Sequence, residues 1–322
     1  MTQNSQYRSA EDIVAKIRRI LGDFPGYRAL HADGRLYRGT FRAGPEAKRY
    51  SRAQHLQGQE VPVTVRFSKG GGDPFAHFSA TVGMAVRFWL PDGRVTNLVM
   101  LSQKLFVANT IDQFLALLES GLPTEPGGPV NRAGLQAFLA ANPNSAAVFK
   151  MRSESLAPVS FAQTEFNSVH AFRYIDAAGT VTHVRCHWVP VAGVEGQPVA
   201  ALAEQPADVL YGEFESRLAE GSAAFDLVLE IAELGDPLDD ATALWPEGRR
   251  RVAIGRLEVL VPIAEAATGD PVMNHDPTAL TDGIEPTDDP ILQIRRGVYE
   301  VSAAGRSGGW QARAAAAGTV VP

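Results

Sequence analysis

The sequence has 322 residues, with 30 lysines and arginines against 36 aspartates and glutamates, which gives a formal net charge of −6 at pH 7. Hydrophobic residues make up 45% of the chain and charged residues 20%, a balance that excludes a disordered polymer. The single cysteine, Cys186, excludes a disulfide scaffold within the chain. The mild acidity argues against nucleic acid or anionic lipid as a partner, because both need a basic surface.

The first predicted element is an amphipathic helix. Ser9 and Asp12 resemble a capping box, and apolar residues recur at helical spacing from Ile13 until Gly22 ends the pattern. The next predicted element is a strand over residues 61–67, where large apolar residues occupy every second position. The further predicted elements are a hairpin over 82–90 and 95–101, a helix over 110–120, one or two helices over 132–149, a hairpin over 169–174 and 181–189, a helix over 211–219, strands over 225–231 and 250–261, and a last helix carrying Arg295 and Tyr299.

This succession predicts an α+β protein in which helices flank a mainly antiparallel sheet. Strands this short and this numerous favour a barrel or a sandwich. The first ten residues carry no apolar stretch of the kind found in secretory signals, and no window of about 18 apolar residues occurs. We therefore expect a cytoplasmic protein with no membrane span.

Two groups of residues resemble functional motifs but favour ordinary structure. Three consecutive glycines at 70–72 follow a strand, yet they lack the Gly-Lys-Ser/Thr ending of a phosphate loop, so a turn is the better interpretation. His183 and His187 are four residues apart in a predicted strand, where that spacing is too long for one metal ion.

Two short groups of residues remain as candidates for chemistry. Arg28 and His31 form the first, and their spacing alone is uninformative. Arg295 and Tyr299 form the second and lie one turn apart on the predicted last helix. A guanidinium beside a phenol favours the phenolate, a ligand of ferric haem iron. From spacing alone, however, a tyrosine packed under an arginine is the preferred interpretation.

The wider sequence changes this preference, because several segments in the same order resemble the haem catalase family. These segments are residues 28–34 (Arg-Ala-Leu-His-Ala-Asp-Gly), 65–68 (Val-Arg-Phe-Ser), 83–88 (Gly-Met-Ala-Val-Arg-Phe), 236–239 (Asp-Pro-Leu-Asp), 244–248 (Leu-Trp-Pro-Glu-Gly), 254–257 (Ile-Gly-Arg-Leu), and the series Asp276-Pro277, 283–286 (Gly-Ile-Glu-Pro), Asp289, Leu292 and Arg295 to Tyr299. The order and spacing of the series carry the resemblance, which spans most of the chain.

The resemblance implies an antiparallel β-barrel of about eight strands with flanking helices, and haem b with ferric iron as the cofactor. It assigns Tyr299 as the proximal iron ligand, Arg295 as its charge partner, His31 as the distal catalytic residue and Ser68 as the hydrogen-bond partner of the His31 ring. It also assigns Arg28 and Arg66 to the haem propionates, Phe114 to the haem face, and Phe106 and Val107 to the distal side. Plain core packing remains an alternative for the last three residues.

The sequence departs from the family in the distal segment. Residues 97–102 (Asn-Leu-Val-Met-Leu-Ser) resemble the family's Asp-Leu-Val-Gly-Asn-Asn, and an ungapped match puts Leu101 at the position of the distal asparagine. Leucine offers no hydrogen-bonding group, so we expect weaker dismutation of hydrogen peroxide and a more apolar pocket. A slip of one residue would instead place the Ser102 hydroxyl there.

The chain also ends 23 residues after Tyr299. We therefore expect the family's C-terminal appendages to be absent, together with the arginine that follows the tyrosine and pairs with a propionate. The nearest resemblance is to the short, catalase-related peroxidases. We expect one catalase-core domain over residues 1–322, made of an N-terminal helix (1–25), a haem-binding core (26–302) and a tail (303–322).

The predicted function is a haem peroxidase that reduces organic peroxides and hydrogen peroxide, with weaker catalase activity. One alternative is a fatty-acid hydroperoxide isomerase of the allene oxide synthase type, and another is a non-catalytic haem-binding protein. The expected partners are the peroxide and an unidentified electron donor. The oligomeric state is open, with a homodimer as the working expectation.

Overall fold

The computed structural model describes residues 9–125, 128–263 and 273–316, with the backbone alone for 307–316. The α-helices in this part of the chain are α1 (Ala10–Leu21), α2 (Ile111–Ser120), α3 (Arg132–Ala141), α4 (Pro143–Ser153), α5 (Val199–Ala203), α6 (Val209–Glu220) and α8 (Pro290–Ala316). The long strands are β1 (Gly34–Ala43), β2 (Glu60–Lys69), β3 (Val82–Trp89), β4 (Val95–Leu101), β8 (Val181–Pro190), β10 (Ala223–Ile231) and β11 (Arg251–Ile263). The short strands are β5 (Ala157–Pro158), β6 (Phe166–Asn167), β7 (Phe172–Ile175), β9 (Gly196–Gln197) and β12 (Ile284–Pro286).

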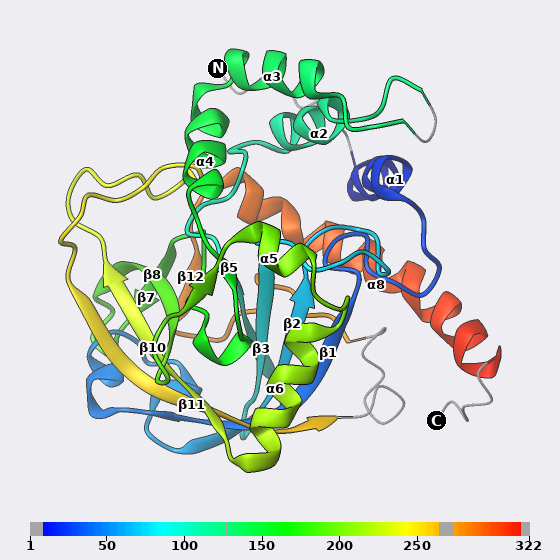
Figure 1. Cartoon of the computed structure of the whole chain (residues 1–322). Coiled ribbons are helices and arrows are strands. Elements are labelled where there is room, and N and C mark those ends of the chain that lie inside the picture. Colours follow the sequence, from blue (N-terminus) through cyan, green and yellow to red (C-terminus); the bar gives the residue numbers. More distant parts are fainter. Residues whose placement is uncertain (1–8, 126–127, 264–272, 317–322) are drawn as a thin grey trace.

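Eight antiparallel strands form a closed barrel. Strands β10, β11, β1, β2, β3, β4, β6 and β8 pair in that order, and a further pairing between β8 and β10 closes the ring. Strands β7 and β12 extend one side of the sheet. The structure therefore confirms the α+β barrel and resolves the choice between barrel and sandwich. In Figure 1 the barrel occupies the lower part of the molecule, with α2, α3 and α4 above it.

Large aromatic side chains fill the barrel interior. Tyr37, Phe41, Phe67 and Phe225 are fully buried, and Trp188 from β8 packs against Phe41 with ring centroids 5.9 Å apart. Because successive residues of a strand point to opposite faces, Phe67 faces this core while Arg66 and Ser68 face outward. The outer face of β2 is nonetheless buried, with Arg66 and Ser68 each 4% exposed. A second layer must therefore cover it.

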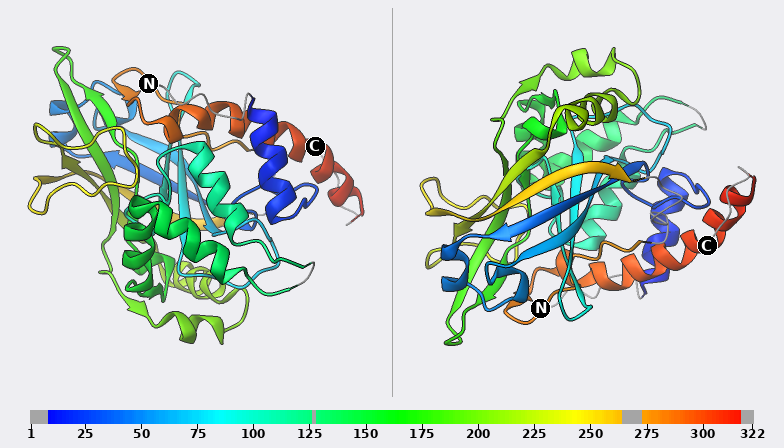
Figure 2. Two further views of the ribbon diagram at one scale, coloured as in Figure 1. Left: turned by 90° about the horizontal axis from the view of Figure 1, so that it is seen from above. Right: turned by 90° about the horizontal axis from the view of Figure 1, so that it is seen from below.

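Helices α1, α2 and α8 supply part of that second layer. The side chain of Ser9 accepts a hydrogen bond from the Asp12 backbone nitrogen, which confirms the predicted cap of α1. Both views in Figure 2 show α1 lying against α8. A separate apolar cluster joins Ile13 and Ile17 of α1 to Phe114 and Leu115 of α2. Among the described residues, no helix is long and apolar enough to cross a bilayer.

The structure resolves one open alternative and changes the extent of one element. The pattern at 132–149, which predicts one or two helices, forms two, because Asn142 and Pro143 separate α3 from α4. Helix α8 continues to Ala316 and so extends beyond residue 302, where a tail was predicted. The last helix therefore continues for more than two turns beyond Tyr299.

Candidate active site

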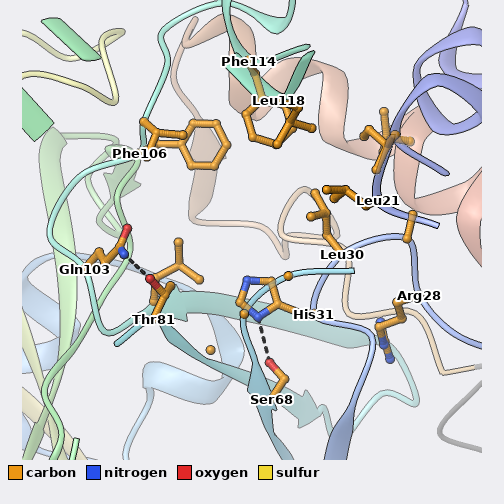
Figure 3. A pocket seen from close by; sticks show the side chains of 18 of the residues that line it. Leu21, Arg28, Leu30, His31, Ser68, Thr81, Gln103, Phe106, Phe114 and Leu118 are labelled. Carbon is orange, nitrogen blue, oxygen red and sulfur yellow. Dashed lines mark hydrogen bonds between the residues drawn. The ribbon is translucent and has the colours of Figure 1, made fainter. Parts of the chain in front are cut away.

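A cavity of about 730 Å³ lies between the outer face of β2, β3 and β4 and helices α1, α2 and α8. It brings together all the residues assigned from the sequence: Arg28, His31, Arg66, Ser68, Phe106, Val107, Phe114, Arg295 and Tyr299. Figure 3 shows His31 beneath the open space, with Leu30, Phe106, Phe114 and Leu118 around it. Its walls are mainly apolar, with a few polar groups, as is usual for small-molecule sites.

Register across three strands builds the floor of the cavity. Ser68 pairs with Gly83, which pairs with Leu101, and the neighbouring row joins Arg66, Ala85 and Val99. The period of two in each strand puts both rows on the same outer face. The middle strand, β3, contributes only Gly83 and Ala85 to these rows. These small residues leave space above β3 for the larger side chains of β2 and β4.

His31 lies in the loop between α1 and β1 and has a left-handed backbone, with φ of 51°. A non-glycine residue in this region is uncommon and is held by its surroundings. The Arg66 guanidinium supplies part of that restraint by donating a 3.1 Å hydrogen bond to the His31 carbonyl oxygen. The ring is restrained as well, because His31 Nδ1 lies 3.1 Å from Ser68 Oγ. The other ring nitrogen is turned toward the cavity (Figure 3).

Gly83 makes the His31–Ser68 pair sterically feasible. A Cβ atom at this position would lie 2.7 Å from Ser68 Oγ and 2.9 Å from His31 Nδ1, both shorter than ordinary contact distances. The backbone of β3 therefore passes directly under the pair. The requirement here is close approach rather than an unusual backbone conformation.

The electrostatic environment keeps His31 neutral. Desolvation by the surrounding protein, together with the positive charges of Arg66, Arg295 and Arg28, lowers its pKa to about 4, although a backbone hydrogen bond with Lys69 acts in the opposite direction. The ring is partly accessible from the cavity but is otherwise enclosed by protein atoms. At neutral pH the ring is thus an imidazole that can accept a proton.

Helix α8 brings Arg295 and Tyr299 to the other side of the cavity. The Arg295 guanidinium lies 5.8 Å from the centroid of the Phe106 ring, and Phe106 packs on Phe114 with centroids 5.2 Å apart. Phe114 is 8% exposed and belongs to the apolar cluster of α1 and α2. Phe106 and Phe114 therefore line the cavity and contribute to core packing at the same time.

A buried hydrogen bond between His170 and Asp289 fixes the start of α8. Asp289 Oδ1 accepts hydrogen bonds from the backbone nitrogens of Ile291 and Leu292, and its Oδ2 lies 2.6 Å from His170 Nδ1. Both side chains are at most 2% exposed. Burial, followed by the charge of Arg295, lowers the pKa of His170 to about 4. His170 thus links α8 to the segment that contributes Val169 to the cavity.

The structure resolves the alternative between Leu101 and Ser102. Leu101 lines the cavity, as its row with Ser68 and Gly83 requires. The Ser102 hydroxyl instead accepts from the Val82 backbone nitrogen at 3.1 Å and donates to the Ala80 carbonyl oxygen. Leucine therefore stands where the family resemblance places an asparagine.

The cavity is less apolar near this leucine than the sequence predicts. Gln103 hydrogen-bonds to Thr81, and Arg152 from α4 donates to Thr81 Oγ1 at 3.1 Å. All three side chains line the cavity. Burial lowers the pKa of Arg152. These polar groups escaped prediction because they come from a turn, a loop and a helix far apart in sequence.

The expectation that no arginine follows Tyr299 in the pocket is wrong. Arg306 lies two turns beyond Tyr299 on α8, is 2% exposed and lines the cavity. Its guanidinium donates a 3.2 Å hydrogen bond to the Met273 carbonyl oxygen, which also accepts one from Arg28 at 2.8 Å. The seven-residue spacing from Tyr299 could have revealed it, because two turns of helix return to the same face.

Comparisons with known proteins agree with this fold. The family described as Catalase matches residues 24–313. The catalase-related peroxidase of Mycolicibacterium paratuberculosis is 37% identical over 301 residues, and the match covers 92% of this chain and 95% of that protein. The catalase-related peroxidase of Synechococcus elongatus is 31% identical, with coverage of 93% and 89%. The chain therefore belongs to the catalase family.

Solved catalase structures share the fold at low sequence identity. A bacterial catalase superposes with a TM-score of 0.78 at 20% identity over 92% of this chain, and a fungal catalase with 0.79 at 18% identity over 96%. The chain spans 60% and 66% of those two chains. The shared part is the barrel with its flanking helices.

Proposed function

We propose that this protein is a haem-dependent peroxidase that reduces organic peroxides and hydrogen peroxide, with weaker catalase activity. One observation carries the proposal: a neutral His31, held at Nδ1 by Ser68, presents its other ring nitrogen to a cavity that Tyr299 enters from α8. The names of the two most similar relatives given above support it. The fatty-acid hydroperoxide isomerase is not favoured by these relatives.

The residues around the cavity fit a haem. Apolar side chains of α1, α2 and β4 form walls suited to a macrocycle, and Arg66 and Arg306 supply the buried positive charge that propionate carboxylates would require. His275 adds two ring nitrogens with no partner among the described residues. We propose haem b with ferric iron, held by the Tyr299 phenolate, with Arg28 and Arg66 as propionate ligands and Arg306 beside them.

The residues of the chain then divide the proton chemistry between them. Bound haem would supply the redox chemistry that breaks the peroxide O–O bond. His31 takes the proton from one peroxide oxygen and delivers it to the other, which leaves as water or an alcohol. Ser68 holds the ring orientation, and Arg295 serves as the charge partner of Tyr299, one turn away on α8. Phe106 and Phe114 limit the access of water to the cavity.

Leu101 sets the balance between the two activities. Its side chain cannot orient a small polar peroxide by hydrogen bonding, whereas apolar contact with an alkyl group is available. We therefore propose that organic peroxides and an electron donor are preferred over a second hydrogen peroxide as reductant. Four expectations stay predictions: a cytoplasmic location, a homodimer, an electron donor as partner, and a single domain over residues 1–322.

The test is turnover with hydrogen peroxide and with an alkyl hydroperoxide, each with and without a donor dye. We expect dye oxidation with both peroxides and slower oxygen release from hydrogen peroxide alone. His31→Ala should lower the peroxide-dependent rate about 10²–10⁴-fold, while His183→Ala, in β8 outside the cavity, should match the wild type. Conversion of a lipid hydroperoxide to an epoxide without donor consumption would contradict the proposal.

A further inference from the structure

His275 is a buried histidine on the cavity that no family assignment above uses. It is 1% exposed, lines the cavity, and has no hydrogen-bond partner for Nδ1 or Nε2 among the described residues. Buried polar groups are nearly always paired, so an unpaired one that faces a cavity calls for a partner there, such as a water, an ion or a ligand. The position of His275 is therefore evidence about what the cavity binds.

Polar contacts on both sides hold the backbone of His275 in place. Arg28 and Arg306 donate to the Met273 carbonyl oxygen, Arg87 donates to that of Asn274, and Asn97 donates to that of Asp276 at 2.9 Å. These four donors come from the loop between α1 and β1, from β3, from β4 and from α8. The chain from 273 to 276 is thus fixed across the outer face of the barrel, and the ring is positioned before any ligand binds.

The surroundings of the ring are strongly positive. Burial lowers the pKa of His275 well below its usual value, and the positive charges of Arg28, Arg87, Arg66 and Arg306 lower it further. The ring is therefore neutral, with one N–H to donate and one nitrogen to accept. The imidazole N–H and the neighbouring guanidinium groups all donate hydrogen bonds, and the guanidinium groups are also positively charged. Together they are suited to an anionic acceptor.

We propose that His275 donates a hydrogen bond to a haem propionate and, with Arg28, Arg66 and Arg306, forms the carboxylate-binding end of the cavity. This inference rests on the haem binding proposed above. It makes His275 a cofactor-positioning residue and not a catalytic one. It also accounts for a buried histidine in a loop whose sequence shows no helical or strand periodicity.

The test measures how fast the holoprotein loses haem to an excess of a haem-free globin. His275→Phe keeps a ring of similar size but removes the donor, and should lose haem about tenfold faster than the wild type. His275→Gln restores an N–H donor and should stay within about threefold. His55→Phe changes another buried histidine, packed against Phe41 and Phe88 away from the cavity, and should leave the rate unchanged.

A second arm replaces haem by its dimethyl ester, which has no anionic carboxylate. The difference between the wild type and His275→Phe should then become smaller, because an ester carbonyl accepts a weaker hydrogen bond than a carboxylate. The proposal is overturned if His275→Phe releases native haem no faster than the wild type, or if it releases the ester faster by the same factor. A wild type that holds haem but oxidises no donor would refute the proposed peroxidase function without affecting this result.

Discussion

Gly83→Ala tests directly whether peroxide turnover depends on the hydrogen-bonded pair of His31 and Ser68. The added Cβ would lie 2.7 Å from Ser68 Oγ and 2.9 Å from His31 Nδ1, whereas ordinary contacts begin at 3.4 Å. The pair must therefore shift, by about 0.7 Å for the serine oxygen, or lose its hydrogen bond. Both atoms belong to side chains rather than to backbone, so we expect the barrel to form normally.

The expected loss follows from the size of this shift. A misplacement of about 1 Å in a catalytic group can cost about 10²-fold in rate, so we expect kcat/KM to fall about 10- to 100-fold, or about 1.4–2.8 kcal/mol. The assay is peroxide-dependent oxidation of a donor dye by protein with matched haem content. Gly212→Ala is the control, because its Cβ would meet no atom within 4 Å on α6.

The reasoning would be refuted by a Gly83→Ala protein that binds haem normally and keeps wild-type kcat/KM. It would also be refuted if Gly212→Ala lost as much activity. Circular dichroism shows independently whether the variant protein is folded. Gly83→Ser, with a larger side chain, should lower both kcat/KM and the folded fraction more than Gly83→Ala does.

Further predictions concern pH, the distal leucine and the start of α8. Because the pKa of His31 is about 4, kcat/KM should fall only below about pH 4, and a fall near pH 6.5 would contradict the account. Stability should be full above about pH 6.5 and decline toward pH 4 in urea unfolding, because the unfolded chain binds protons that folded His31 and His170 exclude. Leu101→Asn should raise oxygen release from hydrogen peroxide without donor by supplying a hydrogen-bonding amide, and an unchanged rate would remove the role given to Leu101. Asp289→Asn keeps a helix-capping side chain but weakens the contact with His170, so urea unfolding should show a loss of about 1.5–3 kcal/mol.

Local patterns in the sequence predict much of this fold. The alternation at residues 61–67 indicates β2, and Pro91-Asp92-Gly93 indicates the turn that makes β3 and β4 adjacent. The same period of two places Arg66 and Ser68 on one face. Pairing between β8 and β10, which closes the barrel, has no local signal because its strands are joined only through a long intervening segment.

The site depends more on features that the sequence does not reveal. The left-handed backbone of His31 and the close approach of Gly83 arise from packing between distant elements. His275 is positioned by arginines from three parts of the chain, and its own segment has no periodic pattern. Tyr299 and His31 could be named only because several family motifs occur in order, which a single spacing does not provide.

The visible absorption spectrum of the purified protein, recorded beside Tyr299→Phe, tests the central claim most directly. We expect the wild type to bind one haem per chain with the spectrum of a phenolate-ligated ferric iron, and Tyr299→Phe to lose this signature while the barrel remains folded. A wild type that cannot be reconstituted with haem, or a variant whose spectrum is unchanged, would contradict that claim.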